Sequence, residues 1–447
     1  MSAERSARSV SETEKVDKVR ALQRVLYRSA KQDPVRRFHA LYDKVARRDI
    51  LWRAWVDVAS NQGAAGVDGV TIASIDDGSV MGVRVFLDGL AQQLRDKTYR
   101  PRPLRRVHIP KPGQPGVTRP LGIPCVADRV VMTAAKIVLE PIFEADFYPV
   151  SFGFRPKRSA HQALEVIRVS ANRGADWVLD ADIKACFDEI DHDALMAQVE
   201  RRVVDGEMLK LLRSWLRAGV FEGGLVSDTD TGTPQGSPIS PLLANIALHV
   251  LDEAWAKAAN MGTLVRYADD FVVLTTSRSR AEEARRRIAE VLAGLGLRLH
   301  PDKTRIVCLK DGEDGFDFLG FHHRKMPSKF GDRRYLSKWP SQRAMVSVRA
   351  KIRERTDRRF ASRDLRDVVA DLTPVLRGWG AYFRYGNSNR KFAVIDSYVH
   401  LRMSKLASVK YATRYRLRAT RFNYGWLTGL GVYRLTGNVR RWRPAYA

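Results

Sequence analysis

The chain has 447 residues, 45% of them hydrophobic, which suits roughly two to four folded domains and excludes an intrinsically disordered protein. Its 77 Lys and Arg against 50 Asp and Glu give a formal net charge of +27, so the expected partner is a polyanion such as nucleic acid. The three cysteines form no CxxC pair, which argues against a disulfide framework or a Cys-rich zinc site. A ribosomal or histone-like protein would have the same charge, so composition alone does not indicate an enzyme.

The N-terminal region is predicted to be helical. After about 15 polar, charged residues, apolar side chains recur with helical spacing from Lys15 to Asn61. Three glycines between Gly63 and Gly69 then predict a structured loop. Because no Gly-Lys-Ser or Gly-Lys-Thr follows, this is not the phosphate loop of a nucleotide triphosphatase. The sequence contains no apolar run of membrane-spanning length and no signal-type segment, so we expect a soluble, intracellular protein.

A basic β-hairpin is predicted from Tyr99 to Pro124. Its prolines and glycines favour extended strands joined by a tight turn. The cations along it suit phosphate contacts, although a solvated charged loop would have the same composition. These cations are Arg100, Arg102, Arg105, Arg106, Lys111 and Arg119.

An amphipathic helix is predicted from Ala127 to Leu139, ending before Pro141. The segment that follows it, residues 151–159, mixes aromatic rings with cations, as a nucleic-acid surface does. Its aromatic rings are equally explained as core residues.

The first acidic segment is Trp177–Ile183, which reads as a strand. Alternation places Asp180 and Asp182 on one face, while Leu179 and Ala181 lie on the other. An acid in a strand of this buried character is costly unless it is paired or bound to a metal.

The second acidic segment is the Asp269-Asp270 pair, which lies between two short β-forming runs at 264–267 and 271–274. Such a pair on its own is most often turn chemistry. Together with Asp182, however, it matches what polymerase chemistry requires. Aspartates from two neighbouring strands there bridge two Mg²⁺ ions that act in phosphoryl transfer.

Five ordered motifs resemble those of reverse transcriptases, and their order and spacing are similar to those of the group II intron reverse transcriptases, also called maturases. They are ADIKACFD at 181–188, GTPQGSPISPLLAN at 232–245, YADD at 267–270, GLRLHPDKT at 296–304 and FLGF at 318–321. Upstream, LYDK at 41–44, AGVDG at 65–69 and the basic hairpin resemble that family's N-terminal extension and fingers. RGWGAYFR at 377–384 resembles its thumb, the maturase or X domain. The similarity covers about residues 15–410.

The resemblance implies an α+β, right-hand polymerase fold with fingers, a palm whose antiparallel sheet is flanked by helices, and a helical thumb. The expected domains are a helical N-terminal extension at 1–80, fingers at 81–175, a palm with the catalytic aspartates at 176–330, a thumb or maturase X domain at 331–410, and a basic nucleic-acid-binding segment at 411–447.

The family's catalytic and metal-binding carboxylates match Asp182, Asp269 and Asp270, and the backbone carbonyl of Ile183 joins them as a metal ligand. The implied cofactor is Mg²⁺, two ions per site, with Mn²⁺ as a possible substitute. Asp182 is preferred to Asp180 because it begins the DIKACF motif.

The nucleotide pocket is implied by the same resemblance. Phe187 matches the aromatic steric gate that excludes a ribose 2′-hydroxyl, with an ordinary core aromatic as the alternative. Lys111 and Arg119 match cations that hold the triphosphate, and Gln235 matches a residue near the nucleotide and template. Lys303 either approaches the nucleotide or stabilises the palm.

Two basic helices are predicted at 344–359 and 365–383, as in a thumb that follows a duplex backbone. Trp379, Tyr382 and Phe383 either stack on RNA or pack between helices, and the tail from 411 is basic with interleaved rings. The candidate nucleic-acid contacts are Arg155, Lys157, Arg158, Arg377, Arg384, Arg414, Arg416, Arg418, Arg440 and Arg441.

The resemblance implies an RNA-directed DNA polymerase that also binds its intron RNA to assist splicing and retromobility. Its expected partners are group II intron RNA, an RNA template with a DNA primer or DNA target, and dNTPs. No membrane partner is expected, and the sequence does not determine the oligomeric state. We expect it in the bacterial cytosol, nucleoid-associated when bound to target DNA. No Cys- and His-bearing endonuclease domain follows in the sequence, so autonomous second-strand cleavage is not expected.

Three alternatives stay open. The first is a domesticated relative that serves host defence or repair, since polymerase motifs do not report genomic setting. The second is a maturase or RNA-binding protein with little polymerase activity, against which the intact aspartates argue. The third, an RNA-dependent RNA polymerase, is disfavoured by the YADD motif and Phe187.

Overall fold

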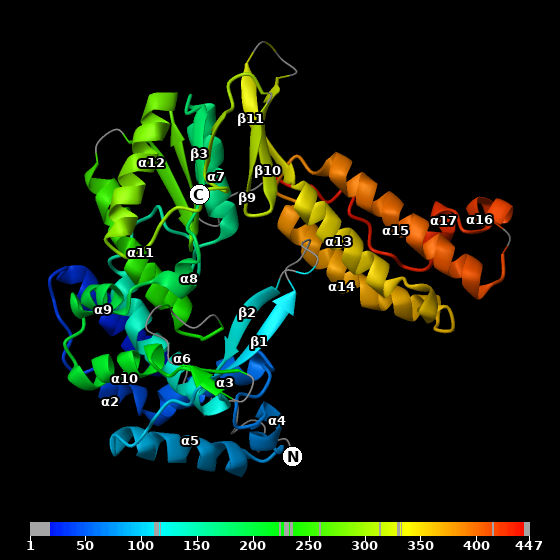
Figure 1. The fold of residues 1–447 in the computed structure, drawn as a ribbon. Helices are drawn as coiled ribbons and strands as arrows, with labels where there is room; N and C mark the ends of the chain where they lie inside the picture. The colour runs from blue at the N-terminus through cyan, green and yellow to red at the C-terminus, as the bar shows by residue number, and fades with distance from the viewer. Residues whose placement is uncertain are drawn as a thin grey trace.

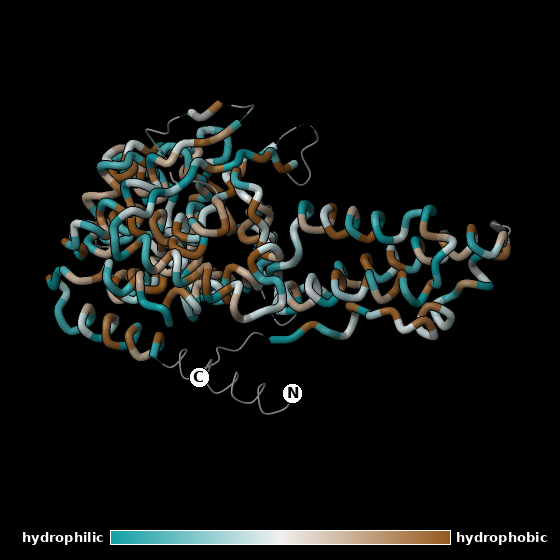
Figure 2. The backbone as a smooth tube through the Cα atoms, turned by 90° about the horizontal axis from the view of Figure 1, so that it is seen from below, coloured by the Kyte–Doolittle hydropathy of each residue, from teal (hydrophilic) through white to brown (hydrophobic). Residues whose placement is uncertain are grey.

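The structure, a computed structural model, describes residues 18–441 except 111–115, 117, 223–224, 228–231, 233–235, 259–260, 313, 329–330, 332 and 414. A body with two four-stranded sheets carries an elongated arm made of helices α13 to α17 (Figure 1). Seen from below, the arm extends away from the body, and its helices alternate hydrophilic and hydrophobic residues along their turns (Figure 2). The mixture of helices and sheets confirms the α+β class.

The N-terminal part of the body is helical, as predicted. Helix is observed over 18–32, followed by α2 (Tyr42–Val45), α3 (Arg48–Ser60), α4 (Ile72–Ile75) and α5 (Val80–Arg95). Helices α2 and α3 pack on the long helix α6 (Val126–Glu144), whose apolar residues are almost all buried, while α5 packs on α3 and α4 on α5. The expected fraying of residues 1–15 lies outside the described residues.

Helix α6 corrects the prediction that it would end before Pro141, because the helix continues through that proline to Glu144. A proline has no N–H group to donate to the carbonyl four residues earlier, which is here Ile137. In this structure the side chain of Gln23 donates to the Ile137 carbonyl at 3.2 Å. The unpaired acceptor is therefore satisfied from another helix.

The basic hairpin is confirmed as β1 (Leu104–Pro110) and β2 (Thr118–Ile123), which pair antiparallel. The short strands β4 (Val220–Glu222) and β5 (Leu225–Ser227) extend it to a sheet of order β2-β1-β4-β5.

The central sheet has the order β6-β7-β3-β8, with every neighbouring pair antiparallel. Its strands are β3 (Trp177–Asp182), β6 (Thr263–Tyr267), β7 (Asp270–Thr275) and β8 (Arg305–Cys308). Helix α12 (Arg278–Ala293) covers one face and α7 (Ala160–Asn172) the other, because apolar residues alternate along the strands. Alternating residues of β3 accordingly enter two different hydrophobic cores.

The remaining helices of the body connect these layers. They are α8 (Cys186–Glu189), α9 (His192–Glu200), α10 (Gly206–Leu216) and α11 (Ser240–Lys257). Asp191 caps α9 by accepting a hydrogen bond from the backbone N–H of Ala194.

A small sheet of order β11-β10-β9 leads into the arm. Its strands are β9 (Gly315–Phe318), β10 (Phe321–Pro327) and β11 (Arg334–Pro340). The arm contains α13 (Gln342–Arg355), η1 (Arg358–Phe360), α14 (Leu365–Phe383), α15 (Asn389–Lys410), α16 (Tyr415–Arg421) and α17 (Tyr424–Gly429). The two predicted basic helices are thus confirmed, the first ending a few residues early.

After α17 the chain returns along α14 and α15. The Asp396 carboxylate accepts from the backbone N–H groups of Leu435 and Thr436, each at 2.9 Å, and Leu435 is fully buried. Within the described ranges, no helix has both the length and the apolar character that crossing a bilayer requires.

Candidate active site

The turn between β6 and β7 presents Asp269 and Asp270 at one edge of the central sheet. Tyr267 pairs with Asp270 across the hairpin, which leaves Ala268 and Asp269 as the two turn residues. Ala268 has a φ of 59°, in the left-handed region that a residue with a Cβ rarely adopts. The predicted arrangement of two short strands with the aspartates at their turn is confirmed.

The register of the central sheet places Asp182 directly opposite Asp270. Asp182 is the last residue of β3, and Asp180 lies two residues earlier on the same face, opposite Val272. Asp182 on β3, Asp270 on β7 and Asp269 in the β6-β7 turn are therefore neighbours, and Asp180 lies two residues before Asp182 on β3.

These carboxyl groups are partly buried and repel one another. Burial, followed by the charges of Asp180, Asp182 and Asp269, raises the pKa of Asp270 to about 8. Burial and then the charge of Asp182 also raise the pKa of Asp269. Burial raises the pKa of Asp180 to about 6, although its pairing with Arg305 at 3.1 Å works against that rise. A bound cation would relieve this repulsion.

Two cations reach the cluster from other elements. Lys303 places its Nζ 2.5 Å from Oδ2 of Asp182, and its charge lowers the pKa of both Asp269 and Asp270. Arg119, on β2 of the basic hairpin, also lies close enough for its charge to lower the pKa of Asp269. The hairpin is thereby brought to the carboxylates, as its predicted triphosphate role requires.

The aspartate cluster has the ligand chemistry of a metal site. Carboxylate oxygens that repel one another are the donors a hard divalent cation prefers, so the chemistry fits. In the part of the chain that the structure describes, however, no three His, Cys, Asp or Glu side chains converge closely enough to hold an ion. Asp182 instead directs one oxygen to Lys303.

Comparison with known proteins identifies the family. Residues 109–323 match the model for "Reverse transcriptase (RNA-dependent DNA polymerase)", and residues 345–424 match "Group II intron, maturase-specific domain". Protein YkfC of Escherichia coli (strain K12) is 34% identical over 363 residues, which cover 72% of this chain and 93% of YkfC. The chain belongs to the group II intron reverse transcriptases.

A second relative extends this result. The group II intron-encoded protein LtrA of Lactococcus lactis subsp. cremoris is 41% identical over 216 residues, which cover 48% of this chain and 35% of LtrA. A chain of a solved structure, "Partial Cas6-RT-Cas1--Cas2 complex", is 25% identical; the match covers 57% of this chain and 41% of that one, with a TM-score of 0.36. As a group II intron reverse transcriptase, the chain is an RNA-directed DNA polymerase with a maturase role in intron splicing and mobility. Its catalysis depends on divalent metal, and it binds RNA.

The expected nucleotide pocket of this reverse transcriptase is described in part. Phe187 lies on α8, half-buried against the core that includes the N-terminal helices. Lys111 and Gln235 lie outside the described residues. Gly236, with φ 107°, packs so closely on the hairpin that a Cβ there would be 2.7 Å from the Gly122 carbonyl oxygen, so glycine is required at this position.

The backbone around Ile183 also pairs locally. Ile183 forms a bridge with Leu299, and the two hydrogen bonds run from the Lys184 N–H to Arg298 and from the His300 N–H to Asp182. These bonds use the carbonyls of Asp182 and Arg298, not that of Ile183.

Arg155 corrects one predicted nucleic-acid contact. Its side chain is buried, makes a bidentate pair with Glu144 at 2.7 and 2.9 Å, and donates to the carbonyls of Phe147, Tyr148 and Ser151. With its guanidinium engaged inside the protein, Arg155 is not available to a phosphate. Its neighbour Lys157 is exposed, and Arg158 is half-buried over the Phe152 ring.

The other predicted contacts lie along the arm. Arg377, Arg440 and Arg441 are exposed, and Arg377 also lies 5.4 Å from the Tyr433 ring centroid. Arg384 and Arg418 are half-buried. Arg414 and the side chain of Arg416 lie outside the described residues.

The aromatic residues of α14 pack between elements of the arm. Trp379 and Phe383 have ring centroids 4.8 Å apart, and Tyr382 donates its hydroxyl to the Leu319 carbonyl at 2.9 Å. All three rings belong to, or lie against, the hydrophobic core on the α7 side of the central sheet, which continues into the arm. Helix packing, not RNA stacking, is therefore the alternative that these contacts support.

Sequence reasoning missed Arg266, which lies on β6 and is fully buried. The available signal was an arginine inside the otherwise apolar run LVRYADDFVVL, because a buried cation requires a partner.

Proposed function

We propose that Asp182, Asp269 and Asp270 are the catalytic carboxylates of this reverse transcriptase, and that they hold two Mg²⁺ ions with the Ile183 carbonyl as a further ligand. The observation that carries the proposal is the register that sets Asp182 opposite Asp270, beside the turn that presents Asp269. When bound, the ions activate the primer 3′-hydroxyl and neutralise charge on the phosphates. Mn²⁺, with similar oxygen-ligand chemistry, is the expected substitute.

The chain's own residues prepare this site. Burial and mutual repulsion raise the pKa values of Asp269 and Asp270, so their full ionisation requires compensating positive charge. Lys303 supplies part of that charge at Asp182. We propose that Lys303 would move off the carboxylate when cations bind, because it contacts an Asp182 oxygen that would otherwise be available to a metal ion.

We assign the nucleotide site to the space between the aspartate turn, α8 and the hairpin. The charge of Arg119 lowers the pKa of Asp269, and Arg119 is proposed to hold the triphosphate together with Lys111. Phe187 is proposed as the steric gate under the incoming sugar, and Gln235 as a contact near the nucleotide and template. The close approach of Gly236 to Gly122 on β2 supports this placement, because Gly236 directly follows Gln235 in the sequence.

In domain terms, the central sheet with α11 and α12 is the proposed palm, and the β1-β2 hairpin belongs to the proposed fingers. The helical extension, fingers, palm and thumb keep the boundaries 1–80, 81–175, 176–330 and 331–410, with 411–447 as a basic nucleic-acid-binding segment. The return of residues 435–440 along α14 and α15 supports a tail that works together with the thumb.

The proposed partners are group II intron RNA, an RNA template with a DNA primer or DNA target, and dNTPs. Exposed cations that remain candidates for these contacts include Lys157, Arg377, Arg440 and Arg441. Partners of this kind imply action in the bacterial cytosol, at the nucleoid when target DNA is bound.

Primer extension on an RNA template with dNTPs and Mg²⁺ tests the assignment. We expect Asp269→Asn to lower the rate by about 10³-fold or more, because catalytic groups that act as a unit fail together. The matched control is Asp180→Asn. Asp180 lies on the same face of β3 but pairs with Arg305, so this variant should keep most of the activity. Equal losses in both variants would refute the assignment of roles.

A further inference from the structure

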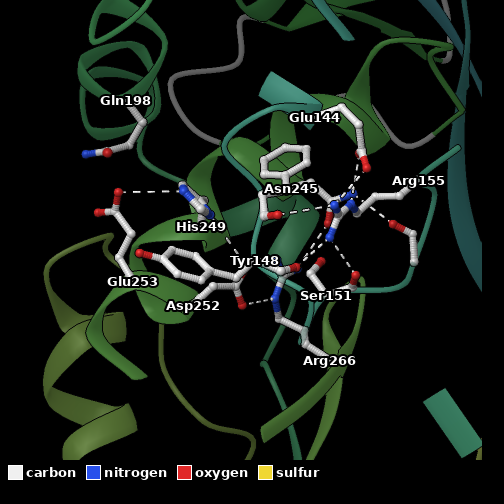
Figure 3. A network of polar contacts seen from close by, with 12 residues as sticks. Glu144, Tyr148, Ser151, Arg155, Gln198, Asn245, His249, Asp252, Glu253 and Arg266 are labelled. Atoms are coloured by element: carbon white, nitrogen blue, oxygen red, sulfur yellow. Dashed lines mark hydrogen bonds and ion pairs between the residues drawn. The ribbon is translucent and has the colours of Figure 1, made fainter. Parts of the chain in front are cut away.

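The buried ion pair between Arg266 and Asp252 is the basis of this inference. Both side chains are fully buried, Arg266 on β6 and Asp252 on α11. Arg266 Nε donates to Asp252 Oδ1 at 2.8 Å, and Nη2 donates to Oδ2 (Figure 3). Although burial works in the opposite direction, the charge and hydrogen bonds of Arg266 hold the pKa of Asp252 below its ordinary value. The carboxylate therefore stays charged in a place where charge is costly.

The third guanidinium nitrogen reaches the aspartate turn. Arg266 Nη1 donates to the carbonyl oxygen of Ala268 at 3.0 Å and to Oδ1 of Asn245 at 3.0 Å. The Ala268 carbonyl belongs to the same rigid peptide unit as the N–H of Asp269. Because Ala268 has the left-handed φ of 59°, an external contact that holds its carbonyl stabilises a conformation the residue disfavours.

The other side of the turn is held by the segment 150–153. Arg266 N–H donates to the Val150 carbonyl at 2.9 Å, and Phe152 N–H donates to the Arg266 carbonyl at 2.8 Å. A Cβ on Gly153 would lie 2.4 Å from the Ala268 nitrogen, so only glycine allows this contact. The Gly153 carbonyl in turn accepts from Asn245 Nδ2 at 2.8 Å.

A purely stabilising role does not account for this arrangement. Buried ion pairs contribute little net stability compared with apolar residues of similar volume. What the pair adds is direction, since a planar guanidinium fixed at two points by Asp252 presents its remaining nitrogen at a defined angle. That nitrogen meets the peptide which leads into the proposed catalytic aspartates.

We propose that Arg266 is the positioning residue for the Asp269-Asp270 turn, oriented by Asp252 and supported by Asn245 and Gly153. This rests on the proposed catalytic role of the two aspartates. Arg155, which holds the carbonyls of residues 147, 148 and 151, acts at one further remove by fixing the segment that pairs with Arg266. The segment 151–159, whose composition suited either a nucleic-acid surface or the core, thus contributes residues that contact the β6-β7 hairpin and hold its position.

The test compares Arg266→Lys with the matched control Arg202→Lys. Lysine keeps the charge at position 266 but loses the fork that reaches both Asp252 and Ala268. Arg202 is also buried, pairs with Asp146 at 3.1 Å and donates to the carbonyls of residues 30, 33 and 34, away from the turn. The two variants carry the same chemical change in similar settings.

For Arg266→Lys we expect kcat for primer extension to fall about 10- to 100-fold, the usual cost of losing a group that orients a catalytic one. KM for dNTP should stay within about 3-fold, and amide hydrogen exchange of the peptide spanning 264–274 should speed up. Arg202→Lys should change neither kcat nor exchange in that peptide. Wild-type kcat in Arg266→Lys, or the same losses in Arg202→Lys, would overturn the proposal.

A second variant covers the case in which Arg266→Lys does not fold. Asn245→Ala removes the bond to the Gly153 carbonyl and the bond from Arg266, and leaves the ion pair in place. It should lower kcat about 10-fold and speed exchange at the turn; if both stay unchanged, the network does not position the turn. Full activity of Asp269→Asn would refute the proposed catalytic role of the aspartates. Failure of the present inference would show separately, because hydrogen exchange at the turn can be measured even in an inactive protein.

Discussion

Lys303 and Asp182 form an ion pair at the edge of the central sheet, with Nζ 2.5 Å from Oδ2. The lysine comes from the loop that pairs with the residues just after β3. A lysine here does two things: it compensates part of the negative charge of four neighbouring aspartates, and it takes an oxygen that a metal ion needs. The position of Lys303 should therefore change when cations or a nucleotide bind at the site.

Replacing Lys303 by Met should shift the pH dependence of primer extension. Its charge lowers the pKa of Asp269 and Asp270, so removing it raises both values further. The rising limb of the pH–rate profile should move to higher pH, by up to about one unit, since the lysine is largely exposed and screened. Lys303→Arg keeps the charge and should keep the wild-type profile. An unchanged profile in Lys303→Met would show that the ion pair does not set the ionisation of the site.

Asp270→Asn should stabilise the metal-free protein at alkaline pH. The pKa of Asp270 is raised to about 8, so between about pH 4 and 8 the folded state holds a proton that the unfolded state has lost. Stability contributed by the protonated group is complete below pH 4 and decreases as pH rises through 8.

Thermal melts in EDTA should therefore show wild type losing stability across this window. Asp270→Asn should lose less, by at least about 1 kcal/mol at pH 8. Added Mg²⁺ should stabilise wild type more at pH 8 than at pH 5. A variant less stable than wild type at pH 8 in EDTA would contradict the repulsion inferred here.

Phe187→Ala should relax sugar discrimination. If the ring lies under the incoming sugar, its removal opens space for a ribose 2′-hydroxyl, and the ratio of ribonucleotide to deoxynucleotide incorporation should rise at least about tenfold. Phe187→Tyr retains the ring and should keep discrimination. An unchanged ratio in Phe187→Ala would assign Phe187 to core packing alone, since it already lies against the core.

Substitutions of Arg155 and Lys157 should have opposite effects on the stability of the fold and on RNA binding. Arg155→Ala leaves Glu144 without its partner and should cost about 3 kcal/mol of unfolding free energy in denaturant titrations. The salt dependence of RNA binding should stay the same in this variant. Lys157→Ala should leave stability unchanged and reduce the salt slope by about one if the exposed lysine contacts a phosphate. The opposite pattern would restore Arg155 as a contact.

Features whose causes are local could be predicted from the amino-acid sequence alone. The β-forming runs around Asp269-Asp270 were recognisable because strand alternation and turn chemistry act within a few residues. The same holds for the basic hairpin and the two faces of β3. The ordered motifs also sufficed to indicate the family, which the comparisons confirm.

By contrast, the partners that charges and helix ends find far away in the chain depend on the three-dimensional fold. Helix α6 passes through Pro141 because Gln23 satisfies the Ile137 carbonyl, and that donor lies 114 residues away. Arg155 looks like a surface cation in sequence, yet the fold places Glu144 and three carbonyls around it. Arg266 lies beside the YADD motif, but its meaning depends on Asp252 from another helix. Burial turns a solvated cation into one that must be paired, and burial is a property of packing, not of local sequence.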